Sequence, residues 1–480
     1  MKDLTQKAID IASSAGATYS DIRIVEINAE NLSTRNGKPR NVSIDNTKGF
    51  GVRVLYDGAW GFSSSSKLTL DSVKEVTLEA LKIARASGKV KKKNVKLSPA
   101  KTIEASYKTP LKKDPFKAPL EDKFSLLIEA DKRVLAQSNL IRVSSSSMRT
   151  HREDKVFANS EGSYITQQIT WVGANTRAVA VGHGEFQDRS FDGRNSRTGG
   201  YEVIETLDLP EKAEESGAEA VKLLTAKNCP EMVTDLIIGG SQLALQIHES
   251  SGHPMELDRA LGSEANMAGT SFLTVDKMGK AQYGSPKVSI TADATAADGL
   301  GTFGYDDEGV PAQRVPLVKE GIFVNYLSDR TFAGELGIAS SGAARASGWN
   351  RIPIPRMTNI NLEPGDWEFD EMVEDTKKGI YVETNRSWSI DDKRLNFQFG
   401  TQIAYLIQNG ELKDLVRNAV YTGITPEFWG SCDAIGNKNH WNMWGTPGCG
   451  KAQPGQVMYV GHGTAPARFR NTRIFSGVTR

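Results

Sequence analysis

Two histidines flank a glutamate in the hexapeptide HESSGH at residues 248–253, directly after an apolar run at residues 243–247. Imidazole nitrogens are common zinc ligands, and a carboxylate beside the first ligand can take a proton from a zinc-activated water molecule. In the known H-E-x-x-H pattern, the two histidines lie one helical turn apart on one face. Here the spacing is one residue longer. In an unbroken α-helix five steps rotate by about 500°, so the second ring would point roughly 140° away from the first.

The residues on either side of His253 offer a way to bring both rings to one metal ion. Gly252 readily adopts the left-handed conformation that ends a helix, and Pro254 cannot continue one. We therefore expect a helix over residues 242–251 and a break at Gly252 that returns His253 to the metal; a π-bulge would have the same effect. The alternative is two ordinary histidines in a loop. Against it, the whole chain has only six histidines, and two of them bracket a glutamate behind an apolar helix.

Composition limits the classes of protein to which the chain can belong. Its 480 residues are enough for two or three domains, and its net charge of +1 creates no field that favours nucleic acid or an anionic membrane. Three cysteines argue against a disulfide scaffold and for a reducing compartment. No secretory signal and no apolar run of bilayer length is apparent. We therefore expect a cytoplasmic protein without direct nucleic-acid or membrane contact.

Helical and strand patterns alternate in the first half of the chain, and short strands dominate the second half. The patterns predict helices over residues 4–15, 70–87, 120–136 and 211–224, with strands between them and a hairpin turn at Asp57-Gly58. A strand at residues 233–238 leads into the metal helix, and the dense turns after residue 272 are typical of an antiparallel sandwich or barrel. We expect an α+β protein with an N-terminal domain at residues 1–228 and a C-terminal β-rich domain at 229–480.

The third metal ligand is less evident than the first two. A catalytic zinc ion usually has three protein ligands and one position for water. The downstream candidates are Cys432, His440, Cys449 and His462. Cys449 is the best of them, because its neighbouring glycines leave the sulfur accessible and Lys451 favours the ionised thiol. Most free cysteines are instead small buried hydrophobic residues, and residue type alone leaves both interpretations open.

Several stretches of the chain occur in an order typical of one family. Besides HESSGH they are GFGVRVLYDGAWGFSSSS at 49–66, FGYDDEGVPAQ at 303–313, IPRMTNINLEPG at 354–365, GIYVE at 379–383, AYLIQNGE at 404–411 and GCGK at 448–451. Together they resemble the TldD/PmbA family of metallopeptidases, most specifically over residues 235–455. The match extends over nearly the whole chain.

The resemblance implies roles for particular residues and a form of assembly. His248, His253 and Cys449 would be the zinc ligands, and Glu249 the catalytic base. The family fold implies an N-terminal α/β domain with antiparallel strands, and a C-terminal antiparallel β-barrel-like domain that carries the metal helix. It also implies a homodimer or a heterodimer with a related subunit. Because this chain keeps the whole metal motif, it is similar to the active, TldD-like subunits rather than to partners that lack the motif.

Zinc-dependent hydrolysis of peptides is the leading hypothesis for function. Glu249 would take the proton of the water and pass it to the leaving amine. The expected substrates are peptides or unfolded proteins, bound as an added strand. Trp429, Trp441 and Trp444 either contact apolar side chains of the substrate or are simple core residues, and the sequence leaves both interpretations open. Within the same class, Cys449 could instead act as a nucleophile with His440 or His462 as its base.

Two hypotheses from other classes remain. One is a non-catalytic binding or regulatory subunit with a structural metal site. Structural zinc sites have four protein ligands, so a fourth ligand such as Cys432 or Glu256 would favour this hypothesis, whereas an open position facing Glu249 would favour a peptidase. The other, suggested by the association of the family with DNA gyrase, is a DNA-directed modulator. The near-neutral charge argues against direct DNA contact.

Overall fold

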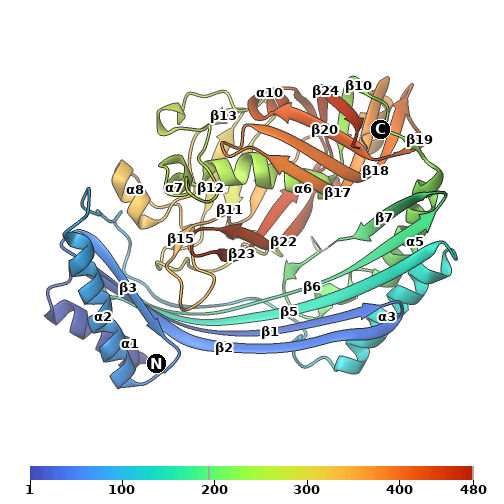
Figure 1. Cartoon of the computed structure of the whole chain (residues 1–480). Coiled ribbons are helices and arrows are strands. Elements are labelled where there is room, and N and C mark those ends of the chain that lie inside the picture. Colours follow the sequence, from blue (N-terminus) through green and yellow to red (C-terminus); the bar gives the residue numbers. More distant parts are fainter. Residues whose placement is uncertain (193–194, 478–480) are drawn as a thin grey trace.

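A long, curved antiparallel sheet lies against a smaller β-rich part that carries the metal motif (Figure 1). The computed structural model describes residues 1–192 and 195–477. Over these residues the sheet has eight strands in the order β3-β2-β1-β5-β6-β4, with β7 and β8 also paired to β6. Their bounds are β1 Tyr19–Arg35, β2 Lys38–Tyr56, β3 Ala59–Ser65, β4 Glu104–Lys108, β5 Ile141–Asn159, β6 Tyr164–Gly182, β7 Glu185–Phe191 and β8 Arg197–Thr198.

Tight turns set the register of the long strands. Asn36 and Gly37 join β1 to β2, Asp57 and Gly58 join β2 to β3, and all four residues have positive φ angles. Two successive residues with positive φ form the hairpin turn whose twist matches that of the flanking strands, and Asn-Gly and Asp-Gly are its preferred sequences. The hairpin predicted at Asp57-Gly58 is therefore confirmed.

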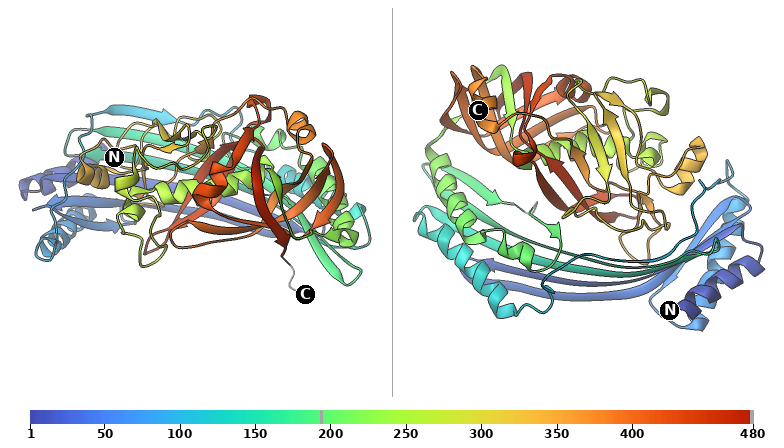
Figure 2. Two further views of the ribbon diagram at one scale, coloured as in Figure 1. Left: turned by 90° about the horizontal axis from the view of Figure 1, so that it is seen from above. Right: turned by 180° about the vertical axis from the view of Figure 1, so that it is seen from behind.

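Helices cover the two ends of the long sheet. Helices α1 (Lys2–Ser14) and α2 (Leu70–Gly88) pack on one end, and α3 (Leu120–Ala136) and α5 (Leu209–Thr225) on the other (Figures 1 and 2). Helix α4 (Glu202–Glu205) is a short turn before α5. Each pair buries small and branched apolar side chains against the strands beneath it. The order helix, strands, helix occurs twice along the chain, as the sequence pattern predicts.

The second part contains a closed barrel. Strands β17-β10-β24-β20-β18 follow one another, and a pairing between β17 and β18 closes the ring. The pairing of β10 with β17 is parallel and the others are antiparallel. Their bounds are β10 Met232–Ile238, β17 Lys378–Ile390, β18 Asn396–Gln408, β20 Ala419–Ile424 and β24 Ala467–Ser476. This confirms the α+β class and the barrel-like C-terminal region.

Shorter elements complete the β-rich part. The strands are β9 Lys227–Asn228, β11 Ile290–Asp293, β12 Arg314–Lys319, β13 Ile322–Phe323, β14 Ala344–Arg345, β15 Ile354–Pro355, β16 Ile360–Leu362, β19 Glu411–Arg417, β21 Cys432–Ile435, β22 Asn442–Lys451 and β23 Gln456–Thr464. The helices are α6 Gly240–Ile247, α7 Leu257–Ala260, α8 Arg330–Leu336, α9 Phe369–Glu374 and α10 Thr425–Gly430. Because β9 pairs with β19, the first residue that belongs to the sheet of the barrel is Lys227. The domain division at 228/229 stays a prediction.

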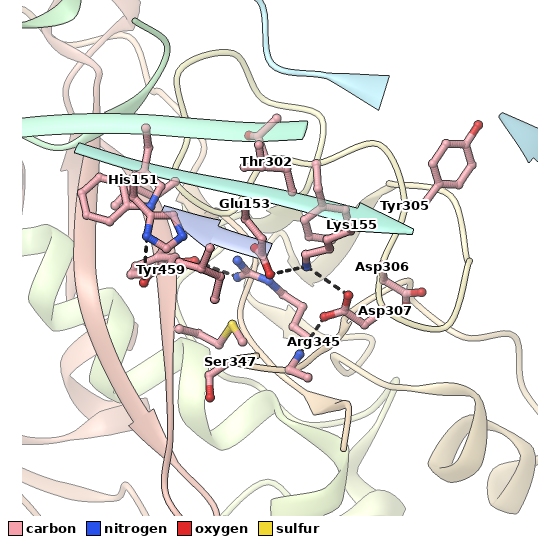
Figure 3. A pocket seen from close by; sticks show the side chains of 17 residues that line it. His151, Glu153, Lys155, Thr302, Tyr305, Asp306, Asp307, Arg345, Ser347 and Tyr459 are labelled. Atoms are coloured by element: carbon pink, nitrogen blue, oxygen red, sulfur yellow. Dashed lines mark hydrogen bonds and ion pairs between the residues drawn. The ribbon is translucent and has the colours of Figure 1, made fainter. Parts of the chain in front are cut away.

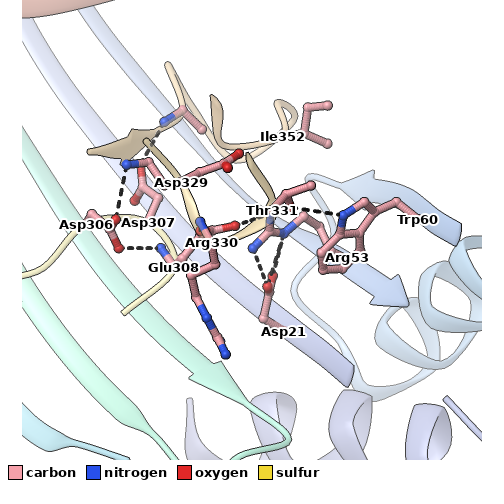
Figure 4. A network of polar contacts seen from close by, with 12 residues as sticks. Asp21, Arg53, Trp60, Asp306, Asp307, Glu308, Asp329, Arg330, Thr331 and Ile352 are labelled. Atoms are coloured by element: carbon pink, nitrogen blue, oxygen red, sulfur yellow. Dashed lines mark hydrogen bonds and ion pairs between the residues drawn. The ribbon is translucent and has the colours of Figure 1, made fainter. Parts of the chain in front are cut away.

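Buried ion pairs join the long sheet to the second part. Arg53 of β2 pairs with Asp21 at 2.6 Å and with Glu308 at 2.9 Å, and all three side chains are at most 7% exposed (Figure 4). Lys155 of β5 pairs with Asp307 at 3.0 Å. The family-like block at 303–313 therefore lies at the junction of the two parts and supplies carboxylates that face cations of the sheet.

A small pocket with a volume of about 30 Å³ lies at this junction, lined by His151, Lys155, Asp307 and Arg345 among others (Figure 3). A water molecule needs a cavity of roughly 10–15 Å³ on this measure. The space therefore suits one or two water molecules and is too small for a peptide.

None of the described helices is long and apolar enough to cross a membrane.

Candidate metal centre

The metal motif begins at the end of α6, an eight-residue helix whose side chains from Gln242 to Ile247 are all buried. Its last turn widens into a π-helix over His248–Gly252, in which the N–H of His253 donates to the carbonyl of His248 five residues earlier. Turns of this kind are rare and occur mostly singly, often at functional sites. The wider turn brings His253 close to His248, which makes the H-E-x-x-x-H spacing compatible with one metal ion.

Gly252 acts through its size and not through a left-handed backbone. Its φ and ψ are −60° and −61°, in the right-handed region. A Cβ atom at this position would lie 2.1 Å from the sulfur of Met357. The predicted left-handed break is therefore wrong and the π-bulge alternative is correct. The helical segment ends in a short 3₁₀ turn over His253–Met255 that contains Pro254.

Cys449 joins the two histidines from strand β22. The ligand atoms of His248, His253 and Cys449 all lie within 4.8 Å of one another, and all three residues are buried. Nε2 of His253 is 3.7 Å from Sγ of Cys449, and the two imidazole rings meet edge to face with centroids 4.9 Å apart. Two imidazoles and one thiol form a donor set that suits zinc. The residues therefore fit the metal that the motif predicts.

The protonation states at the cluster favour metal binding. Burial lowers the pKa of His248 to about 4 and also lowers that of His253, so both imidazoles are neutral at pH 7. Burial raises the pKa of the Cys449 thiol, but the positive charge of Arg356 and the contact of Sγ with Nε2 of His253 outweigh this effect and hold the pKa below its usual value. Neutral imidazole and ionised thiol are the forms that bind zinc.

Arg356 was not evident from the sequence around Cys449. Its guanidinium donates a hydrogen bond of 2.5 Å to the backbone carbonyl of Cys449. Lys451, expected to favour the ionised thiol, instead pairs with Asp258 at 2.6 Å and with Glu256 at 3.3 Å. That expectation for Lys451 is wrong, because two carboxylates hold its ammonium group and a distant arginine lies beside the cysteine.

Each histidine of the cluster has a partner on its other ring nitrogen. Nδ1 of His248 is 2.8 Å from Nε2 of His462, and Nδ1 of His253 is 3.0 Å from Oε2 of Glu256. Partners of this kind orient metal-binding imidazoles and select the tautomer that presents Nε2 to the metal. The sequence suggested His462 as a third ligand and Glu256 as a fourth. Both residues instead contact the Nδ1 atoms of the two cluster histidines.

Glu249 lies in the π turn next to His248 and is buried. Its Oε2 pairs with the guanidinium of Arg394 at 2.5 Å. Arg394 belongs to the turn between β17 and β18, about 145 residues away in the sequence. The candidate base is therefore held in place by an arginine that no local pattern in the sequence indicates.

The remaining candidates lie elsewhere. Sγ of Cys432 contacts the carbonyl of Ala434 in β21 at 3.9 Å, and Nε2 of His440 is 2.6 Å from Glu368. Over residues 1–192 and 195–477, the cluster thus contains three histidine or cysteine ligands and no fourth ligand from histidine, cysteine, aspartate or glutamate.

The tryptophans of the 429–444 segment do not form one exposed surface. Trp429 is fully buried, and its Nε1 donates to Ser250 in the π turn at 2.9 Å. Nε1 of Trp441 donates to the carbonyl of Leu362 at 2.9 Å. For Trp429 the core interpretation is therefore correct: its side chain supports the metal turn from inside the core.

The fold and the buried donor set define a two-part α+β protein with a centre suited to zinc. The chain matches the models of three successive PmbA/TldA metallopeptidase domains: domain 1 at residues 20–84, the central domain at 113–227 and the C-terminal domain at 234–474. It belongs to this metallopeptidase family, whose members include TldD and PmbA.

Curated relatives cover most of the chain. A metalloprotease of Methanocaldococcus jannaschii is 32% identical over 419 residues, which are 87% of this chain and 89% of the relative. A metalloprotease of Methanothermobacter thermautotrophicus is 31% identical over 459 residues, 95% of each chain. A zinc metalloprotease TldD homologue of Saccharolobus solfataricus is 23% identical over 427 residues, 87% of this chain and 89% of the relative.

Two solved structures share the fold. A crystal structure from Thermotoga maritima superposes with a TM-score of 0.78 at 18% identity, covering 98% of this chain and 99% of that chain. TldE from Thermococcus kodakarensis has a TM-score of 0.75 at 16% identity, with the same coverage. At this identity the likeness concerns the fold alone.

Proposed function

We propose that the protein is a zinc-dependent peptidase that hydrolyses peptides or unfolded proteins. The observation that carries the proposal is the π turn, which brings His248 and His253 together with Cys449 and which also contains Glu249. The names of the relatives, which include metalloproteases and a zinc metalloprotease, support the same class.

The following residues would take part in metal binding and catalysis. His248, His253 and Cys449 would hold the zinc ion. When bound there, zinc would supply Lewis-acid chemistry for the activation of water and the polarisation of the scissile carbonyl. Glu249 accepts the proton of the attacking water and passes it to the nitrogen of the leaving amine. His462 and Glu256 orient the two imidazoles through their outer nitrogens.

The arrangement favours this mechanism over the alternatives. A structural zinc site needs four protein ligands, and the described cluster supplies three. Cys449 as a nucleophile would need a histidine base, but His440 contacts Glu368 and His462 contacts His248. The imidazole next to Sγ is that of His253, which the proposal assigns to the metal. We also propose a dimer, with a second copy or a related subunit, and a reducing, cytoplasmic setting that suits the three free cysteines.

The decisive experiment replaces the base and keeps the metal ligands. Glu249→Gln is expected to retain zinc and fold but to lose peptide hydrolysis, since positioned acid–base catalysis contributes about 10²–10⁴-fold. Zinc content, the circular dichroism spectrum and hydrolysis of a quenched unfolded peptide would be measured on the same preparation. Full activity of Glu249→Gln would show that the chemistry lies elsewhere, and Cys449→Ala would then test the nucleophile.

A further inference from the structure

The turn between β17 and β18 holds an arginine against the candidate base. A guanidinium nitrogen of Arg394 is 2.5 Å from Oε2 of Glu249, and the two side chains are 16% and 8% exposed. Hydrogen bonds between charged groups are short and strong, and they fix the orientation of both partners. Among the described residues, this is the contact that restrains the carboxylate, and it engages only one of its two oxygens.

The backbone of Arg394 has an unfavourable conformation that its surroundings maintain. Its φ is +63°, in the left-handed region that residues other than glycine rarely adopt. The N–H of Arg394 donates to the carbonyl of Asp391 at 2.9 Å, and its carbonyl accepts from the hydroxyl of Thr425 at 2.9 Å. Strained residues persist only where their surroundings fix them, and they concentrate at functional sites.

Two backbone hydrogen bonds from residues 270–272 hold this turn in place. The N–H of Thr270 donates to the carbonyl of Asp392 at 3.0 Å, and that of Phe272 donates to the carbonyl of Lys393 at 2.9 Å. The turn is therefore joined to the segment that follows the metal motif in the sequence. Its position, and with it that of Arg394, is fixed relative to the metal turn.

The guanidinium also has an unsatisfied donor. Nε of Arg394 is buried and has no hydrogen-bond partner within the described part of the chain. A buried donor without a partner is unfavourable for stability. Arg394 thus combines an unsatisfied donor, a left-handed backbone and a buried charge, none of which favours stability. Features that oppose stability in this way are expected where function requires them.

We propose that Arg394 is a positioning residue for the reaction. Its guanidinium holds Oε2 of Glu249 and so fixes the plane of the carboxylate, which leaves Oε1 to accept the proton of the attacking water. A general base must lie within hydrogen-bond distance of the proton that it removes, and a carboxylate free to rotate would often be misplaced. The inference rests on the proposed function, since it concerns the base of that reaction.

The alternative role is charge compensation, in which Arg394 merely neutralises a buried carboxylate. The two roles differ in what the enzyme loses when the arginine is replaced. A compensating charge affects folding and metal loading, whereas a positioning residue affects turnover through Glu249 alone. Measurement of kcat and KM together with stability and zinc content therefore separates them.

The first experiment compares Arg394→Gln and Arg394→Lys with the full-length, zinc-loaded protein. Misplacement of a reacting group by about 1 Å can reduce the rate by about 10²-fold, so Arg394→Gln is expected to lower kcat by about 10–100-fold. KM, zinc content and melting temperature are expected to stay close to those of the parent protein. Arg394→Lys, which keeps the charge, should recover part of kcat and remains informative if the glutamine variant does not fold.

The second experiment tests coupling to the base. If Arg394 acts through Glu249, the double variant Glu249→Gln/Arg394→Gln should be no slower than Glu249→Gln alone. Arg417→Gln is the control, because Arg417 in β19 is also a mostly buried arginine, 11% exposed, that pairs with a glutamate, Glu185 at 2.8 Å, away from the metal turn. That variant should keep kcat even if its melting temperature falls.

Three results would overturn the inference. The first is an unchanged kcat in Arg394→Gln. The second is a decrease in zinc content and melting temperature that parallels the decrease in kcat. The third is a kcat of the double variant that falls by the product of the two single-variant factors. If the parent protein, loaded with zinc, hydrolyses no peptide, the proposed function itself fails. An active parent with a fully active Arg394→Gln would contradict only the role of Arg394.

Discussion

Residues around the metal centre contact the proposed ligands and control their charge and orientation. Arg356 favours the ionised thiol of Cys449, and Glu256 holds the imidazole of His253. Each contact leaves one ligand atom directed to the cluster. If the three-residue cluster is the zinc site, removal of a single ligand should abolish stoichiometric metal binding.

Zinc content is the direct test at this scale. The purified protein is expected to carry one zinc ion per chain, and His248→Ala and Cys449→Ala should each lose it, because two ligands rarely retain zinc at a site that normally has three. Elemental analysis of dialysed protein measures the content. His440→Ala, whose imidazole contacts Glu368 outside the cluster, should keep its zinc. Unchanged zinc in both ligand variants would contradict the site.

At the scale of elements, strand β5 meets strand β23 through a buried histidine. His151 is stacked on Trp171 with centroids 5.4 Å apart and contacts the ring of Tyr459 at 4.7 Å (Figure 3). Burial, together with the positive charge of Lys155, lowers the pKa of His151 from 6.5 to about 3. The imidazole is therefore neutral in the folded protein over a wide range of pH.

This histidine makes the folded state sensitive to acid. The unfolded chain binds a proton at His151 below about pH 6.5 and the folded chain only near pH 3, so stability decreases as pH falls between these values. The difference in pKa corresponds to about 2 kcal/mol lost between pH 7 and pH 5. His151→Phe keeps the stacking and removes the titration, so its melting temperature should fall less over this range.

Thermal unfolding at pH 7 and pH 5 measures the effect. His183→Gln, a change at an exposed histidine, is the control and should show the same fall as the parent protein. Equal falls in His151→Phe and the parent protein would mean that other groups, such as the carboxylates at the junction of the two parts, cause the acid sensitivity.

At the scale of the whole molecule, the long sheet has a partly open edge. Strand β3 pairs with β2 only over residues 50–56. On the same edge, none of the described strands pairs with residues 38–49 of β2. Val42 and Ile44 lie in this stretch and are 49% and 67% exposed. Open strand edges tend to pair or be covered, which supports the proposed dimer.

A dimer that encloses the metal centre would admit only an extended chain. Because strand addition uses main-chain hydrogen bonds, we expect broad specificity for unfolded peptides and little cleavage of folded proteins. One small protein would be offered in native and unfolded forms beside a set of short peptides, with light scattering to give the oligomeric state. Equal cleavage of both forms, turnover of one sequence only, or a fully active monomer would contradict this view.

Much of the architecture follows from local pattern. The predicted helix over 120–136 coincides with α3, and those over 4–15, 70–87 and 211–224 differ from α1, α2 and α5 by at most two residues at each end. Periodicity and turn sequences act over a few residues, so they are readable without knowledge of the fold. The strand patterns predicted a sandwich or barrel; which of the two forms depends on pairings between distant segments, such as that of β10 with β17 and with β24.

The sequence by itself determined that His248, Glu249 and His253 belong together, because the three residues are close in the chain and of the types that zinc chemistry needs. Only the tertiary structure decided how they meet, through a π turn that Met357 and Trp429 support from distant segments. It also brought Arg356 to Cys449 and Arg394 to Glu249. An arginine carries no local signal of its partner, since a long charged side chain can pair with any carboxylate or carbonyl that folding places beside it.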